Sequence, residues 1–166
     1  MMLFPGKKAR KIQLLILDVD GILTSGRLFY AANGEVSVGF HVHDGLGMKQ
    51  LQQNGMEVAI ITARQSDAVA KRMQDLGIQH VFQGQHDKEI AFNKIKQQLQ
   101  LEDSQIAYMG DDLPDLPLLK RAGLSVTVKN APKMIRREVD WITRAPGGEG
   151  AVRELCDRIL QAKGGF

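Results

Sequence analysis

The chain has 166 residues, with 22 Lys+Arg against 19 Asp+Glu and a net charge of +3. This length suits one domain with its own core, and 43% hydrophobic residues exclude a disordered or collagen-like chain. A single cysteine excludes an internal disulfide, and no apolar run approaches the roughly 20 residues of a membrane helix. We therefore expect a cytoplasmic protein without a membrane partner, and the interspersed charges argue against a nucleic-acid partner.

Short apolar runs alternate with longer amphipathic segments along the chain. The runs predicted as strands are 12–17, 58–61, 79–82, 106–109, 124–128 and 141–143. The segments predicted as helices are 46–53, 67–76, 88–99, 113–122 and 151–160. Because strands that alternate with helices form parallel sheets with right-handed crossovers, the pattern predicts an α/β fold, a Rossmann-like parallel sheet flanked by helices.

One segment, about 26–41, breaks the alternation. Two β-like stretches, 27–31 and 35–41, flank Asn33-Gly34, a pair that suits a hairpin turn with positive φ at both central residues. We expect a projecting β-hairpin with more apolar surface than a solvated ribbon tolerates. Asp44, which follows it, is predicted to cap the next helix.

Polar residues collect where the predicted strands end, at the edge where open parallel sheets bind ligands. Asp18 and Asp20 follow the first strand, Thr62 the second, and Asp111 and Asp112 the fourth. Lys88 opens the helix after the third strand. Clustered carboxylates repel each other unless a cation lies between them, and oxygen ligands suit Mg²⁺. Thr62 and Lys88 could bind phosphate oxygens. Each residue alone also has a structural interpretation, such as a turn at Asp20-Gly21 or an N-cap at Asp112.

These residues resemble the motifs of the haloacid dehalogenase-like superfamily. The matching stretches are Asp18-Val19-Asp20-Gly21, Ile60-Ile61-Thr62, Lys88 and Gly110-Asp111-Asp112-Leu113-Pro114-Asp115, in family order. The resemblance implies a phosphatase with an aspartyl-phosphate intermediate and Mg²⁺ as cofactor.

The resemblance also implies a role for each residue. Asp18 would be the nucleophile and Asp20 the acid/base, with Thr62 and Lys88 binding the phosphoryl group. The metal ligands would be Asp18, Asp111 and the backbone carbonyl of Asp20. Asp112 and Asp115 would lie next to the catalytic and metal-binding residues and orient them, and Gly21 would line the substrate site.

Superfamily members often carry a cap domain, for which this chain has little room. Thr62 lies only 44 positions after Asp18, and Lys88 only 26 positions after Thr62. We expect residues 1–166 to form a single capless domain. The chain is similar to a capless family, the 3-deoxy-D-manno-octulosonate 8-phosphate phosphatases, whose members are tetramers. The likeness implies that the hairpin and a mobile glycine-rich segment from about 147 lie near neighbouring active sites, with Arg153 as a substrate contact.

The residues after Thr62 bear on the substrate. Relatives often read Thr-Gly-Arg where this chain reads Thr62-Ala63-Arg64, so Ala63 and Arg64 are candidate substrate-binding residues. A related branch that acts on nonulosonate 9-phosphates carries glutamate at the position of Arg64. A guanidinium pairs well with a sugar-acid carboxylate, so Arg64 favours the octulosonate phosphate, which feeds lipopolysaccharide biosynthesis. The nonulosonate phosphatase remains one alternative, and a phospho-accepting receiver-like signalling module is another.

Overall fold

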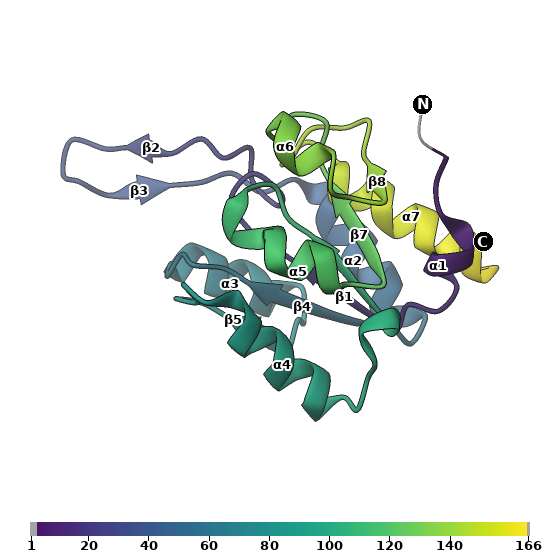
Figure 1. Ribbon diagram of the computed structural model, residues 1–166. Coiled ribbons are helices and arrows are strands. Elements are labelled where there is room, and N and C mark those ends of the chain that lie inside the picture. Colours follow the sequence, from purple (N-terminus) through teal and green to yellow (C-terminus); the bar gives the residue numbers. More distant parts are fainter. Residues whose placement is uncertain (1–2, 166) are drawn as a thin grey trace.

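The computed structural model describes residues 3–165 of the chain. Its centre is a six-stranded parallel sheet in the order β5-β4-β1-β6-β7-β8 (Figure 1). The strands are β1 (Leu14–Leu17), β4 (Glu57–Ile61), β5 (His80–Phe82), β6 (Ile106–Met109), β7 (Leu124–Thr127) and β8 (Trp141–Ile142). All six predicted strands are present, and the order confirms the predicted parallel α/β sheet.

Helices cover both faces of the sheet because the central strands are apolar on both sides. Leu15 and Leu17 face one core with α2 (Val42–Gln53), α3 (Asp67–Asp75) and α7 (Ala151–Lys163). Leu14 and Ile16 face the other core with α4 (Lys88–Gln98) and α5 (Leu116–Arg121). Every residue of β1 is buried, as expected for a strand at the centre of a three-layer fold.

Three short helical segments lie outside the predicted pattern: α1 (Gly6–Ala9), η1 (Asp103–Gln105) and α6 (Lys133–Arg136). Each has three or four residues, too few to show a helical period in the sequence. The helix predicted at 113–122 is instead divided into a three-residue 3-10 helix, η2 (Leu113–Asp115), and α5. Among the residues that the structure describes, no helix has the length and apolar character needed to span a bilayer.

The hairpin projects from the body of the molecule (Figure 1), but its paired strands are short. They are only β2 (Phe29–Tyr30) and β3 (Val36–Ser37), so the predicted strands at 27–31 and 35–41 were too long. The predicted turn was also wrong in detail, since Gly34 has φ +87° while Asn33 is not among the residues with positive φ. Asn33 instead accepts a hydrogen bond from the Glu35 N–H at 3.0 Å through its side chain. The Ala31 N–H donates to the Glu35 carbonyl at 2.9 Å, which closes a three-residue loop with Gly34 in the left-handed position.

Helix α2 begins at Val42, four residues before the predicted start, which shortens the second arm of the hairpin. The reason is that His41 caps the helix, with its Nδ1 accepting a hydrogen bond from the His43 N–H at 3.2 Å. Asp44 therefore lies in the first turn of α2 and does not cap it. Its Oδ1 accepts from the Arg153 N–H at 2.8 Å, at the start of α7, so Asp44 ties α2 to the C-terminal helix.

Candidate active site

All of the predicted site residues except Arg153 meet in one pocket at the carboxyl ends of the central strands. Its lining comprises Asp18, Asp20, Gly21, Ser25, Gly26, Thr62, Ala63, Arg64, Lys88, Asp111, Asp112, Pro114, Asp115 and Asn130. Strands β4 and β6 pair with β1 on either side, so the segments that follow them emerge next to Asp18. The parallel register therefore brings together residues that lie far apart in the sequence.

Lys88 is the positive centre of the site and is almost completely buried. Its Nζ lies 2.9 Å from Asp18 Oδ1 and 2.6 Å from Asp115 Oδ1. Burial alone would lower the pKa of Lys88, but the attraction of these two carboxylates outweighs it and raises the pKa. Lys88 is therefore an ammonium at neutral pH, able to attract an anion.

Asp115 is fixed by hydrogen bonds to both of its carboxylate oxygens. Its Oδ1 accepts from Lys88 Nζ and from the Tyr108 hydroxyl, each at 2.6 Å. Its Oδ2 accepts from the backbone N–H groups of Asp111 at 2.9 Å and Asp112 at 3.2 Å. Because both oxygens are committed, Asp115 orients Lys88 and the loop of Asp111, which suits the supporting position predicted for it.

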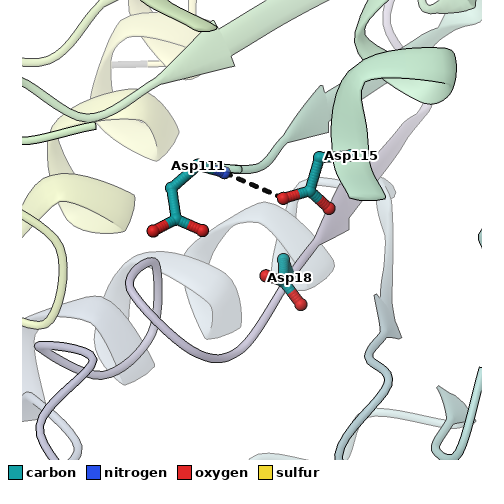
Figure 2. Close-up of side chains that lie close together, drawn as sticks. All are labelled: Asp18, Asp111 and Asp115. Carbon is teal, nitrogen blue, oxygen red and sulfur yellow. Dashed lines mark hydrogen bonds between the residues drawn. The ribbon is translucent and has the colours of Figure 1, made fainter. Parts of the chain in front are cut away.

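Asp111 brings a third carboxylate to the same place. Asp18, Asp111 and Asp115 each have a carboxylate oxygen within 4.8 Å of the others (Figure 2). Burial, followed by repulsion from Asp115, raises the pKa of Asp18 to about 7 despite the attraction of Lys88. Burial and repulsion from Asp18 likewise raise the pKa of Asp111 to about 7. The single positive charge of Lys88 does not neutralise the negative charge that these three carboxylates carry when ionised.

The donor set of this cluster fits a divalent cation. A cation between Asp18 and Asp111 would relieve their repulsion and lower both pKa values. The donors are carboxylate oxygens at an open pocket, where water and phosphate oxygens can complete the shell that Mg²⁺ requires.

Gly21 keeps the pocket open beside Asp111. A Cβ at Gly21 would lie 2.0 Å from Asp111 Oδ2, so a side chain there would displace that carboxylate. Gly147 packs against the backbone of the same loop, where a Cβ would lie 1.7 Å from the Gly21 carbonyl oxygen. The Gly148 N–H also donates to the Ile22 carbonyl at 2.9 Å. Gly147 and Gly148 therefore pack against the loop that follows Asp18 and hold it in place.

Asp20 is not part of the three-carboxylate cluster and pairs with Arg64. Arg64 Nε lies 2.8 Å from Asp20 Oδ2 and 3.0 Å from Oδ1. The Arg64 N–H donates to Thr62 Oγ1 at 3.1 Å, so the Thr62 hydroxyl is itself fixed in a tight turn. Ala63 lies between these two residues on the pocket wall.

Two of the predicted residues lie at the edge of the pocket or outside it. Asp112 is exposed at the edge of the pocket, where its Oδ1 accepts from the Leu113 N–H at 2.8 Å; this is the N-cap that the sequence also allowed. Arg153 lies on α7, outside the pocket, with Nε bonded to Asp157 at 2.7 Å. The segment from Gly147 contacts its own chain here, and its reach to a neighbouring subunit stays a prediction.

The sequence analysis missed four residues that line or support this pocket: Ser25, Gly26, Tyr108 and Asn130. Tyr108 lies within β6 and its hydroxyl donates to Asp115, and a hydroxyl in an otherwise apolar strand was the available signal. Asn130 follows β7 and accepts from the Gly147 N–H at 3.1 Å. Applying the strand-end rule to the fifth predicted strand would have pointed to Asn130.

Comparison with known proteins supports the resemblance that the site motifs indicate. Residues 78–155 match the family model of haloacid dehalogenase-like hydrolases. The chain is 45% identical over 157 residues to the 3-deoxy-D-manno-octulosonate 8-phosphate phosphatase KdsC of Escherichia coli strain K12, covering 95% of this chain and 84% of that protein.

Solved structures agree with this likeness. The 3-deoxy-D-manno-octulosonate 8-phosphate phosphatase from Moraxella catarrhalis, in complex with magnesium, phosphate and KDO, superposes with a TM-score of 0.94 at 45% identity. The match covers 97% of this chain and 92% of that one. The cobalt-bound phosphatase from Haemophilus influenzae gives 0.91 at 43% identity, covering 95% and 92%. With this fold, this ordered set of carboxylates and this identity, the chain belongs to the 3-deoxy-D-manno-octulosonate 8-phosphate phosphatase family of haloacid dehalogenase-like hydrolases.

Proposed function

We propose that this chain is a Mg²⁺-dependent phosphatase that hydrolyses 3-deoxy-D-manno-octulosonate 8-phosphate to the free sugar acid and phosphate. The observation that carries the proposal is the pairing of Asp18 with Lys88 at 2.9 Å beside Asp111. A nucleophile, a cation for the phosphoryl group and a metal-binding carboxylate lie within one pocket, in a family whose named members act on this substrate.

In the first step, an Asp18 carboxylate oxygen forms a bond to phosphorus while the bond from phosphorus to the sugar oxygen breaks. Asp20 gives its proton to that oxygen, because an alkoxide leaves poorly without one. The Thr62 hydroxyl and the Lys88 ammonium hold the oxygens of the phosphoryl group as it moves. The product of this step is an aspartyl-phosphate and a free sugar acid.

In the second step, water attacks the phosphorus of the aspartyl-phosphate. Asp20, now a carboxylate, takes the proton of that water, and the bond between Asp18 and phosphorus breaks. Inorganic phosphate leaves and Asp18 returns as a carboxylate. The pocket is open to solvent at the sheet edge, which supports entry of the water from this side.

The cation would be held by Asp18, Asp111 and the backbone carbonyl of Asp20. Asp112 and Asp115 would orient these groups without binding the cation directly. When bound, Mg²⁺ neutralises charge on the phosphoryl oxygens and on Asp18. Gly21 and Ala63 leave room for the substrate, and Arg64 supplies a guanidinium for its carboxylate.

We propose further that residues 1–166 work as one capless domain, in the cytoplasm, as a homotetramer. Between Asp18 and Thr62 the structure contains only the hairpin, α2 and β4, which supports the absence of a cap. The exposed apolar side chains of the hairpin support burial against other subunits, including Phe29, 59% exposed, and Tyr30, 71% exposed. Arg153 is then a candidate contact to a neighbour's substrate.

A phosphate-release screen across sugar phosphates, with and without Mg²⁺, tests the proposal. We expect the highest kcat/KM for the octulosonate 8-phosphate, loss of activity in chelator, and no turnover in Asp18→Asn. Higher kcat/KM for a nonulosonate 9-phosphate would reassign the substrate. Undiminished turnover in Asp18→Asn would contradict the mechanism, and a stable phosphoprotein without phosphate release would favour a signalling module.

A further inference from the structure

The Asp20 carboxylate is held by a single side chain among the residues 3–165. Both of its oxygens accept from Arg64 Nε, at 2.8 and 3.0 Å, and the Asp20 side chain is 37% exposed. No other side chain in this part of the structure bonds to it. A carboxylate this exposed would sample several rotamers without that contact.

Arg64 is anchored well enough to act as a support. Its backbone N–H donates to Thr62 Oγ1 at 3.1 Å, and its carbonyl accepts from the Gly84 N–H at 3.1 Å, after β5. The side chain is 22% exposed, so most of its length is packed. The backbone from which the guanidinium projects is therefore hydrogen-bonded both to Thr62, directly after β4, and to Gly84, after β5.

The guanidinium offers two separate edges. The Nε edge is taken by Asp20, whereas the two Nη groups have no acceptor among the described residues. A planar fork of this kind can bind a carboxylate through the Nη groups while Nε keeps its bond. A lysine ammonium at this position could not serve both partners with the same geometry.

We infer that Arg64 is a positioning residue for Asp20 as well as a contact for the substrate, an inference that rests on the proposed function. The side chain that would bind the sugar-acid carboxylate also orients the group that moves the proton. A bound carboxylate would restrain the guanidinium and, through Nε, the Asp20 carboxylate. Substrate recognition and proton transfer are coupled through one residue.

A role limited to substrate binding makes a different prediction. If Arg64 only bound the sugar-acid carboxylate, its loss would leave phosphate esters without a carboxylate unaffected. If Arg64 also positions Asp20, its loss slows those esters too. General acid/base groups contribute roughly 10²–10⁴-fold, so losing the orientation of Asp20 would lower kcat by roughly 10- to 100-fold.

The test compares wild type, Arg64→Gln and Arg64→Lys on three substrates with Mg²⁺ present. The substrates are the octulosonate 8-phosphate, ribose 5-phosphate, which lacks a carboxylate, and p-nitrophenyl phosphate, whose leaving group needs no proton. The control is Arg137→Gln, at an exposed arginine outside the pocket. Thermal unfolding of each variant checks that it is folded.

We expect both Arg64 variants to lose roughly 10- to 100-fold in kcat on ribose 5-phosphate. On p-nitrophenyl phosphate they should release a burst of nitrophenolate and then turn over slowly, because only the water step still needs Asp20. On the octulosonate 8-phosphate, Arg64→Lys should have a lower KM than Arg64→Gln, and the two variants should have the same reduced kcat. A kcat on ribose 5-phosphate equal to that of wild type would overturn the inference, whereas an inactive wild type on all three esters would overturn the proposed function.

Discussion

Removing the metal and raising the pH should destabilise this protein through Asp18. The pKa of Asp18 in the metal-free fold is about 7, against an ordinary value of 3.8, mainly because the group is buried. The folded chain therefore holds a proton that the unfolded chain has already lost at pH 5. The stability that the folded state gains by keeping Asp18 protonated is fully present below about pH 4 and is lost as the pH rises through 7.

The size of the effect follows from the same values. Between pH 5 and the folded pKa of about 7, each pH unit costs 1.36 kcal/mol, so the loss from Asp18 is about 3 kcal/mol by pH 8. Asp111, whose pKa is also about 7, acts in the same direction. Asp103 and Asp140 have lowered pKa values, and their contributions change only below about pH 4, outside this window.

Urea unfolding in chelator at pH 5, 6, 7 and 8 measures this slope. Asp18→Asn is the matched control, because it removes the titrating group and also one of the repulsions that add to burial in raising the pKa of Asp111. Added Mg²⁺ should stabilise wild type more at pH 8 than at pH 5, since protons compete for the same oxygens. Equal slopes in wild type and Asp18→Asn, or no effect of Mg²⁺ at pH 8, would refute this reasoning.

Three substitutions test the supports of the site. Lys88→Met removes the cation shared by Asp18 and Asp115, and we expect a loss of about 3–5 kcal/mol in urea unfolding at pH 8; an unchanged midpoint would count against the buried pair. Tyr108→Phe takes a donor from buried Asp115, with an expected cost of roughly 1–3 kcal/mol and a lower kcat at unchanged KM; wild-type values of both would show that the hydroxyl is dispensable. Gly147→Ala places a Cβ 1.7 Å from the Gly21 carbonyl oxygen, so the loop must move and phosphatase activity should fall by more than about 10-fold. Gly6→Ala, where a Cβ would contact nothing within 4 Å, is its control, and equal activity of the two variants would contradict the proposed packing.

The sequence was most informative where geometry follows from the parallel sheet itself. Asp18, Thr62 and Asp111 could be placed together because each follows a strand, and neighbouring parallel strands end at one edge. Lys88 could be placed because it opens the helix after the third strand. These positions depend on chain direction and register, which hydrophobic patterning specifies.

Side-chain partners were much less predictable. The contact of Asp20 with Arg64 depends on rotamers of two side chains from different loops, and no sequence pattern encodes it. The bond from Arg153 N–H to Asp44 joins residues 109 positions apart, so Asp44, predicted to cap α2, instead binds the first turn of α7. Hairpin strands were overestimated because β-like composition continues past the residues that pair.

The central claim is that Asp18 carries the phosphoryl group during turnover. The most direct measurement is mass spectrometry of acid-quenched Asp20→Asn after incubation with p-nitrophenyl phosphate and Mg²⁺. The leaving group of this ester needs no proton, while the water step stalls, so we predict one added phosphoryl group on the peptide that contains Asp18. Release of nitrophenolate with no phosphoryl group on that peptide, or with the group on another residue, would contradict the account.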